Sequence, residues 1–201
     1  MELILASQSP RRKELLTLLG RPFRVQVAAV DETMEDLPVD QAAAVDETME
    51  DLPVDQAVSR LSYRKAAAVG AGEDQVVIGA DTVVVLDGQI LGKPRDAEDA
   101  VRMLKSLSGK THQVMTGVCV LKGKKVLTHT EVTEVTFRSL TDGEIESYVA
   151  TKEPMDKAGA YGIQGGAARF VEGIRGDYYN VVGLPVCRLG QMLEEIMEEI
   201  Q

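Results

Sequence analysis

The sequence has only two cysteines and no tryptophan among its 201 residues. Cys119 and Cys187 both lie in apolar runs, so we expect no disulfide framework and favour a cytoplasmic protein. The two histidines, His112 and His129, do not have the spacing of zinc ligands. Neither cysteine has a neighbouring histidine, which leaves nucleophilic thiol chemistry without support.

Long hydrophobic runs are missing as well. The most hydrophobic windows are short and interrupted by Asp, Glu or Lys, so we expect no membrane-spanning helix, and the first residues do not resemble a secretory signal. Aromatic residues make up only 4% of the chain and do not interleave with basic residues as they do in single-strand binders. The 22 basic and 32 acidic residues give a net charge of −10, which argues against binding to nucleic acid or anionic membranes.

What the sequence does contain is a perfect tandem repeat. Residues 28–42 and residues 43–57 both read AAVDETMEDLPVDQA. Two copies are too few for a solenoid, and no other segment follows this period. Each copy carries five acidic residues and no basic one, so a single copy accounts for half of the net charge of −10. We interpret the extra copy as a solvated acidic insertion.

Outside the repeat, strands alternate with helices. The hydrophobic fraction of 44% and the charged fraction of 27% are ordinary for a globular protein, and the length suits one domain. This alternation, with an antiparallel pair in its middle, predicts an α/β fold with a mixed sheet. Expected helices span residues 10–20, 54–69, 96–107, 142–151 and 184–200, and expected strands span 3–6, 23–27, 76–80, 83–86, 113–121 and 126–137.

The first candidate for chemistry is the sequence Ser-Gln-Ser-Pro-Arg-Arg at residues 7–12. Ser9 can cap a helix that starts at Pro10, which places Arg11 and Arg12 in its first turn. Free N–H groups and the helix dipole attract anions there, and arginine suits phosphate oxygens. The pattern therefore favours an anion site, with a solvated helix end carrying two surface arginines as the alternative.

The second candidate is Asp81, a carboxylate within the apolar stretch at residues 77–83. An unpaired buried carboxylate is costly, so Asp81 needs a metal, a cation or hydrogen bonds. This favours a metal ligand or a general base over a structural turn aspartate. Lys93 follows after a hairpin turn at Asp87 and Gly88, and could bring a positive charge back to the same place.

The third candidate is the glycine-rich sequence Tyr-Gly-Ile-Gln-Gly-Gly at residues 161–166. Its glycines allow close approach of the backbone, and Gln164 can both donate and accept hydrogen bonds, as reading the edge of a nucleobase requires. A second polar stretch at residues 176–185 carries no such signal, and we interpret it as a structural loop.

Six motifs in this order resemble those of the Maf family of nucleoside triphosphate pyrophosphatases. Together they run over nearly the whole chain, and their order makes the resemblance specific although each motif alone is weak. The motifs are SQSPRR at 7–12, VDE at 30–32, GADT at 79–82, LGKP at 91–94, DKAGAYGIQG at 156–165 and VGLP at 182–185.

The resemblance implies a fold and a reaction. It implies a single Maf-like domain over residues 1–201, with a mixed twisted sheet in two lobes and a central cleft, as in inosine triphosphate pyrophosphatases. Family members are often dimeric, use Mg²⁺ or Mn²⁺, and are linked to arrest of septum formation. The residues at 10–12, 81–82 and 163–164 resemble those of the branch that hydrolyses dTTP and UTP to the monophosphate and pyrophosphate.

The resemblance also implies roles for individual residues. Asp81 is the proton acceptor and, with Glu32, a metal ligand, whereas Arg11, Thr82 and Gln164 set base specificity. The remaining phosphate-site residues are Ser7, Arg12 and Lys93. Modified pyrimidine nucleotides are a narrower alternative substrate class, and a non-catalytic nucleotide-binding regulator of cell division is the alternative function.

The duplication offers two candidates for one site residue, Glu32 and Glu47. The strand expected at residues 23–27 leads straight into Glu32, whereas counting back from the helix that contains Lys65 favours Glu47. A strand in a sheet is harder to shift in register than a loop is to lengthen. We therefore expect Glu32 to occupy the site.

Overall fold

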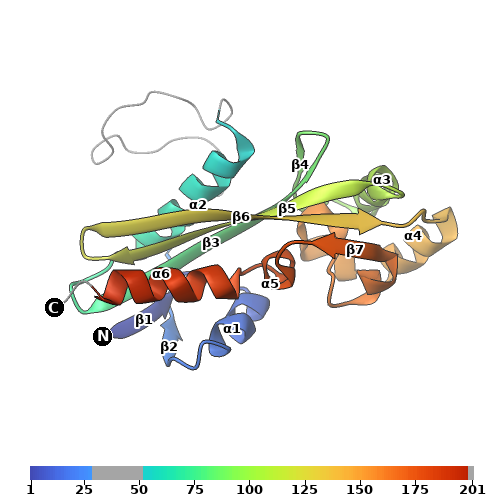
Figure 1. The fold of residues 1–201 in the computed structure, drawn as a ribbon. Helices are drawn as coiled ribbons and strands as arrows, with labels where there is room; N and C mark the ends of the chain where they lie inside the picture. Colours follow the sequence, from blue (N-terminus) through green and yellow to red (C-terminus); the bar gives the residue numbers. More distant parts are fainter. Residues whose placement is uncertain (29–51, 199–201) are drawn as a thin grey trace.

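A computed structural model describes residues 1–28 and 52–198 of the chain (Figure 1). Its centre is a seven-stranded sheet in the order β2-β1-β3-β5-β6-β7, with β4 paired to β3 outside this path. β1 is parallel to β2 and β3, and every other pairing is antiparallel, so the predicted α/β fold with a mixed sheet is confirmed. The strands are β1 (Glu2–Leu5), β2 (Phe23–Val25), β3 (Gln75–Leu86), β4 (Gln89–Leu91), β5 (Thr111–Lys122), β6 (Lys125–Phe137) and β7 (Val171–Arg175).

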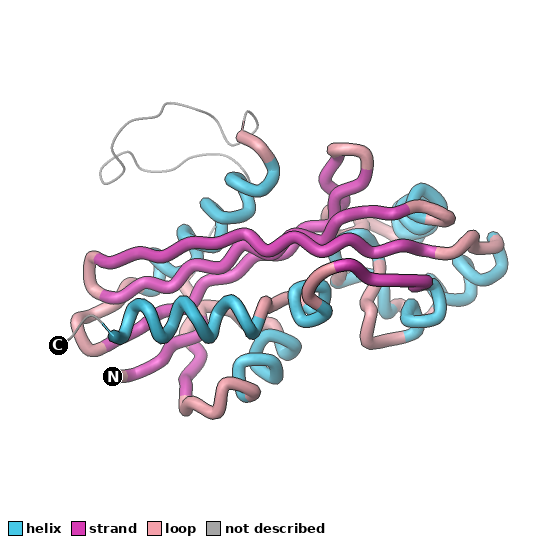
Figure 2. Tube along the Cα trace, in the orientation of Figure 1, coloured by secondary structure: helices cyan, strands magenta, loops and turns pink. Residues whose placement is uncertain are grey.

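Helices cover both faces of this sheet. Alternate residues of β1 face opposite sides: Leu3 and Leu5 belong to the large core shared with α1 and α6, whereas Ile4 belongs to a smaller core under α2. The three long strands β3, β5 and β6 connect two groups of elements, with α1, α2 and α6 at one end and α3 and α4 at the other (Figures 1 and 2). The helices are α1 (Pro10–Thr17), α2 (Val54–Val69), α3 (Ala97–Leu107), α4 (Asp142–Ala150), α5 (Tyr178–Val182) and α6 (Val186–Glu198).

Helix α2 lies directly on the sheet because two strand residues have no side chain. A Cβ atom on Gly79 would lie 2.1 Å from the Ser62 carbonyl oxygen, and one on Gly117 would lie 2.4 Å from the Val58 carbonyl oxygen. Any larger residue at either strand position would push the helix away from the sheet. This close packing brings the middle of α2 over β3.

Several local predictions are confirmed to within a residue. Helix α2 spans residues 54–69 as expected. Ser9 caps α1 by accepting a hydrogen bond from the Arg12 N–H, and Asp96 caps α3 in the same way through the Asp99 N–H. Asp87 and Gly88 form the hairpin turn with positive φ angles of 52° and 79°.

Other expectations need correction. The two short strands expected at 76–80 and 83–86 are one continuous strand, β3, because the GADT sequence stays extended and pairs with β5. β2 ends at residue 25 instead of 27, and α6 begins at residue 186 instead of 184. β7 is not among the expected strands, and α5 lies within the polar stretch at residues 176–185 that was interpreted as a structural loop.

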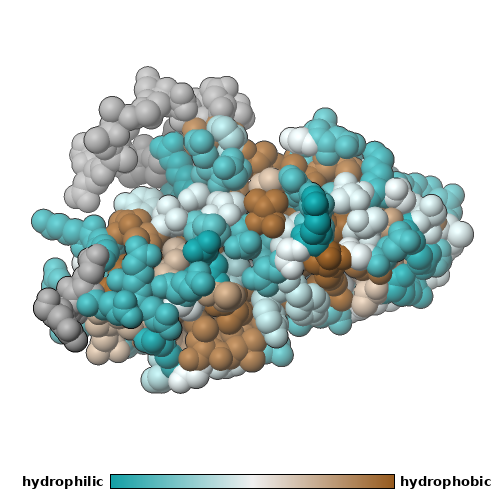
Figure 3. Space-filling model, viewed as in Figure 1, coloured by the Kyte–Doolittle hydropathy of each residue, from teal (hydrophilic) through white to brown (hydrophobic). Residues whose placement is uncertain are grey.

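Glu32, Glu47 and almost all of the first repeat copy lie outside the described residues, and so does the start of the second copy. Within the described part, no helix is both long enough and apolar enough to cross a membrane. Hydrophilic side chains cover most of the face that carries α6, with small hydrophobic patches between them (Figure 3).

Candidate active site

All of the predicted site residues that the structure describes line one cavity, with a volume of about 1280 Å³. They come from four separate segments of the chain: the β1–α1 connection with the first turn of α1, β3, the segment after β4, and the glycine-rich loop. These residues are Ser7, Arg11, Arg12, Asp81, Thr82, Lys93 and Gln164.

The cavity lies beside an open stretch of the edge of β3. β1 pairs with this edge as far as Ile78, and β4 pairs with it only from Val84 onward. Asp81 and Thr82 lie in the stretch between these two pairings. Because successive side chains of a strand point to opposite faces, Asp81 turns toward α2 and Thr82 turns toward α1 and α5.

Arg12 is held in place by three segments of the chain. Its Nε donates to the Gly183 carbonyl oxygen at 2.9 Å, and its Nη2 donates to the Thr82 hydroxyl at 2.9 Å. Its Nη1 donates a longer bond, 3.4 Å, to the hydroxyl of Ser7. These bonds fix the plane of the guanidinium at the wall of the cavity, although the side chain begins on the surface of α1.

The carboxylate of Asp81 has a cationic partner that the sequence analysis missed. Lys65 Nζ donates to Asp81 Oδ1 at 2.7 Å, and the two side chains are only 13% and 15% exposed. Lys65 lies one helical turn after Leu61, which also lines the cavity. A lysine within the sheet-facing stripe of α2 was therefore the available signal.

The opposite wall of the cavity is a loop clamped by Glu153. Its carboxylate accepts hydrogen bonds from the Gly166 N–H at 3.0 and 3.2 Å and from the Tyr148 hydroxyl at 3.0 Å. The Tyr148 oxygen in turn accepts a bond from the Gly162 N–H at 3.2 Å. Both ends of the loop from residue 162 to residue 166 are thereby fixed, and Gln164 lies exposed between them.

The glycines that follow Gln164 are explained by the same clamp. A Cβ atom on Gly165 would lie 1.9 Å from Glu153 Oε1, and one on Gly166 would lie 3.2 Å from the Tyr148 ring. A side chain at Gly165 would therefore displace the carboxylate that holds the loop.

Four further titratable groups support this wall. Lys157 Nζ donates to Asp156 Oδ1 at 2.7 Å, and this bond lowers the pKa of Asp156. The Tyr161 hydroxyl is hydrogen-bonded to Nε2 of His112 at 2.8 Å. Burial lowers the pKa of His112 to about 4 and raises the pKa of Tyr161, so both groups are neutral near pH 7.

Arg11, Lys93 and Gln164 differ from these residues because their side chains have no hydrogen bond or ion pair to another described residue. All three line the cavity, and Lys93 and Gln164 are exposed. Among the residues that the structure describes, five cationic and three carboxylate side chains line the cavity, so its described lining is positive in a chain of net charge −10. They are Arg11, Arg12, Lys65, Lys93 and Lys157, and Asp81, Glu153 and Asp156.

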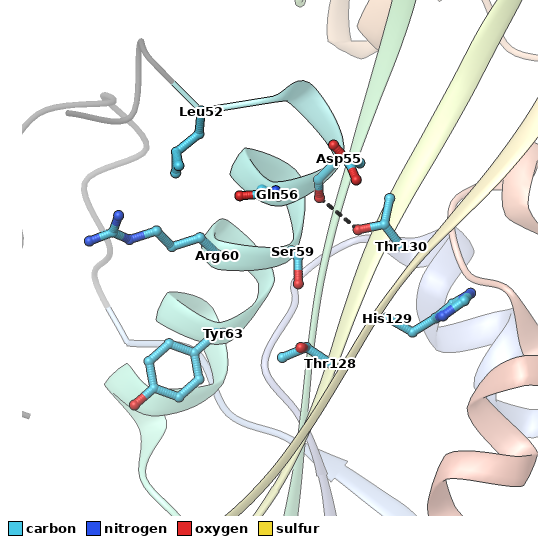
Figure 4. A pocket seen from close by; sticks show the side chains of 9 residues that line it. All are labelled: Leu52, Asp55, Gln56, Ser59, Arg60, Tyr63, Thr128, His129 and Thr130. Carbon is cyan, nitrogen blue, oxygen red and sulfur yellow. Dashed lines mark hydrogen bonds between the residues drawn. The ribbon is translucent and has the colours of Figure 1, made fainter. Parts of the chain in front are cut away.

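A second hollow, of about 610 Å³, lies between α2 and β6 (Figure 4). Thr130 donates a hydrogen bond to the Asp55 carbonyl oxygen across it at 2.8 Å, and the Arg60 and Tyr63 side chains extend away from Thr130 (Figure 4). None of the predicted site residues that the structure describes lines this hollow. It is therefore not the candidate site.

The described residues do not by themselves complete a site for a divalent metal in the cavity. Among residues 1–28 and 52–198, no group of three His, Cys, Asp or Glu side chains could hold an ion. Mg²⁺ in phosphate enzymes is commonly bound by one or two carboxylates together with phosphate oxygens and water. Asp81 can supply one such carboxylate.

The family model for Maf-like proteins matches residues 2–196 of the chain. The chain belongs to the Maf family. The Maf chain is 51% identical over 195 residues to a dTTP/UTP pyrophosphatase of Bacillus cytotoxicus, covering 96% of this chain and 94% of the relative. A protein of the same name from Bacillus mycoides is 48% identical, and the match covers 99% of this chain and 97% of that relative. Another, from Bacillus anthracis, is 49% identical, and the match covers 96% of this chain and 95% of that relative.

Among solved structures, the Maf chain is similar to that of the Staphylococcus aureus Ham1 protein, with a TM-score of 0.48 and 12% sequence identity. The match covers 98% of this chain and 100% of that chain.

Proposed function

We propose that this Maf protein is a nucleoside triphosphate pyrophosphatase that hydrolyses dTTP and UTP to the monophosphate and pyrophosphate. The observation that carries the proposal is the meeting of phosphate-binding cations, a carboxylate and a base-reading glutamine in one cavity. Relatives named dTTP/UTP pyrophosphatase, about half identical over nearly the whole chain, support the same reaction.

The triphosphate would bind at the side of the cavity that carries Arg12, Asp81 and Thr82, which we call the strand wall. Arg12 is already oriented by its hydrogen bonds, so it can present donors to phosphate oxygens with little reorganisation. Arg11, Lys93 and Ser7 would complete this phosphate site. Charge that develops on the oxygens between the α and β phosphates would then be stabilised by fixed donors.

Asp81 would act as the general base that removes a proton from the attacking water. The Lys65 ammonium donates a hydrogen bond to Asp81 Oδ1 at 2.7 Å, which orients the carboxylate at the cavity wall. A bound Mg²⁺ or Mn²⁺, held by Asp81, Glu32 and phosphate oxygens, would supply Lewis-acid polarisation of the phosphates. Glu32 stays a prediction from the sequence.

The base would face the loop held by Glu153. Gln164 can donate to one carbonyl of a pyrimidine-2,4-dione and accept from its N3–H, whereas cytosine presents a different edge. Arg11 and Thr82 would contribute to the same discrimination, as the family resemblance implies.

The setting of this activity also stays a prediction. We propose that the enzyme acts in the cytoplasm without binding nucleic acid or a membrane surface. A homodimer and a link to septum formation are expectations of the family resemblance. A nucleotide sensor without turnover would use the same cavity, and turnover distinguishes the two.

The proposal is tested by incubating the protein with each canonical ribo- and deoxyribonucleoside triphosphate in Mg²⁺, Mn²⁺ or EDTA. Chromatography of the products should show monophosphate and pyrophosphate, with dTTP and UTP turned over at least about tenfold faster than the others. EDTA should abolish the reaction. Release of inorganic phosphate, or binding without turnover, would contradict the proposal, and the second result would favour the sensor.

A further inference from the structure

A continuous line of hydrogen bonds runs from Arg12 into the interior of the protein. Arg12 Nη2 donates to the Thr82 hydroxyl at 2.9 Å, the Thr82 and Thr116 hydroxyl oxygens are 2.9 Å apart, and Thr116 donates to the Asn180 carbonyl oxygen at 3.1 Å. Since Thr116 uses its single proton on Asn180, Thr82 must donate to Thr116. The whole line therefore has one direction, away from the guanidinium.

The line closes into a ring through the end of α5. The Asn180 carbonyl oxygen also accepts the Gly183 N–H at 3.0 Å, and the Gly183 carbonyl oxygen accepts from Arg12 Nε at 2.9 Å. The Nη2 and Nε hydrogen bonds of Arg12 thus both lead to Asn180, the first through two threonine hydroxyls and the second through a single turn of backbone.

The side chain of Asn180 anchors this ring to the sheet. Its Nδ2 donates to the Val114 carbonyl oxygen at 3.0 Å and to the Thr133 hydroxyl at 2.9 Å, which are acceptors on β5 and β6. Thr116, Thr133 and Asn180 are completely buried, and neither Thr116 nor Asn180 lines the cavity. Polar groups in such a position are costly unless they are bonded, so the bonds are held firmly.

We propose that Thr116 and Asn180 are positioning residues that fix the guanidinium of Arg12 for the phosphates of the nucleotide. The inference rests on the proposed function, because it assigns Arg12 a phosphate ligand. Thr116 supplies the acceptor that keeps the Thr82 hydroxyl proton turned away from Arg12, which leaves a Thr82 lone pair for Nη2. The Asn180 carbonyl oxygen accepts from both Thr116 and the Gly183 N–H, and so fixes the positions of the two acceptors of Arg12, Thr82 and Gly183, relative to each other.

Thr116→Val tests the role of the hydroxyl with almost no change in shape. Thr116→Ser keeps the hydroxyl, and Thr136→Val is a matched control because Thr136 forms a similar hydroxyl pair with Thr111, at 2.8 Å, on the same sheet outside the cavity. We expect Thr116→Val to lower kcat/KM for dTTP about tenfold, mainly through KM. Thr116→Ser and Thr136→Val should stay within about twofold of the wild type.

Combining Thr116→Val with a change at Arg12 shows whether the activity loss in Thr116→Val arises from the position of Arg12 or from lower stability of the protein. In an Arg12→Lys background, whose ammonium cannot bond Gly183 and Thr82 as the guanidinium does, Thr116→Val should cost less than about twofold. The same loss in both backgrounds would overturn the inference. Thermal melting of each variant establishes the folded fraction. If Thr116→Val does not fold, Thr82→Val breaks the same line from the cavity side and should show the same coupling to Arg12 in its affinity for inorganic pyrophosphate, which contains no base.

Calorimetric binding of inorganic pyrophosphate distinguishes failure of this inference from failure of the proposed function. If the wild type binds pyrophosphate and Thr116→Val binds it about tenfold more weakly, the positioning role stands even for a protein without dTTP turnover. Equal affinity in the two proteins, or no binding by the wild type, would overturn it.

Discussion

The two walls of the cavity differ in how their polar side chains are held. At the strand wall, Arg12 donates hydrogen bonds to Thr82 on β3 and to the Gly183 carbonyl oxygen at the end of α5, and Asp81 accepts one from Lys65 on α2. At the loop wall, the backbone is clamped by Glu153, but Gln164 itself has no partner among the described residues. Adjacent arginines repeat the contrast, because the Arg12 side chain is bonded to other described residues and the Arg11 side chain is bonded to none of them.

This difference matches the two parts of a nucleotide. Donors that stabilise charge on a triphosphate are most effective when they are oriented before the substrate arrives. A side chain that reads a base must instead keep its hydrogen-bonding groups available for the ligand. We therefore expect changes at the strand wall to affect binding of the phosphates and turnover, and changes at the loop wall to affect affinity and selectivity for the base.

The largest effect is expected for Asp81→Asn. Loss of the general base should lower kcat for dTTP by at least about 100-fold. Asp87→Asn is the matched control, because Asp87 lies on the surface at the end of the same strand and pairs with Lys110. Steady-state rates of pyrophosphate release measure both, and wild-type kcat in Asp81→Asn would refute the assignment of the base.

A smaller effect is expected when the loop wall is loosened. Tyr148→Phe removes the hydroxyl that joins Gly162 to Glu153, so the position of Gln164 should become less defined. We expect KM for dTTP to rise about three- to tenfold with little change in kcat, and the preference for dTTP over dCTP to fall. Tyr178→Phe, on an exposed tyrosine, is the control. A fall in kcat at constant KM would show that the loop wall contributes to turnover and not to affinity for the base.

The smallest effect concerns stability behind the loop wall. The pKa of buried His112 is about 4, below the ordinary value of 6.5, so the unfolded chain takes up a proton between these pH values while the folded chain does not. The free energy of unfolding should therefore fall as pH drops from 6.5 toward 4, by up to about 1.4 kcal/mol per pH unit, and this histidine should contribute no slope above pH 6.5.

Urea denaturation across this pH range measures that slope. His112→Gln should reduce the slope of the free energy of unfolding against pH. His129→Asn, at the half-exposed second histidine, should keep the share of the slope that comes from His112. An unchanged slope in His112→Gln would contradict the interpretation of His112 as a buried neutral group.

Local patterns were sufficient to predict much of the fold. Ser9, Asp96 and the turn at Asp87 and Gly88 act through contacts within four residues, so their roles follow from the sequence alone. β7 was missed because it is a short edge strand in a glycine-rich segment, and α5 because it is a single helical turn.

The candidate site was predictable where residues belong to recognisable motifs. The residues that hold these side chains in place were not predictable, because they come from distant segments. Lys65 reaches Asp81 only because Gly79 and Gly117 let α2 lie on the sheet. Asn180 is likewise 64 residues from Thr116. Periodicity places Lys65 on the sheet-facing side of α2, but no local spacing specifies which distant residue such a side chain contacts.

The central claim is that a nucleoside triphosphate lies across this cavity with its phosphates at the strand wall and its base at the loop wall. The most direct test is a crystal structure of Asp81→Asn with dTTP and Mg²⁺. We predict phosphate oxygens within hydrogen-bonding distance of Arg12 and Lys93, and the thymine ring beside Gln164. A nucleotide in the opposite orientation, or one bound in the hollow between α2 and β6, would contradict the account.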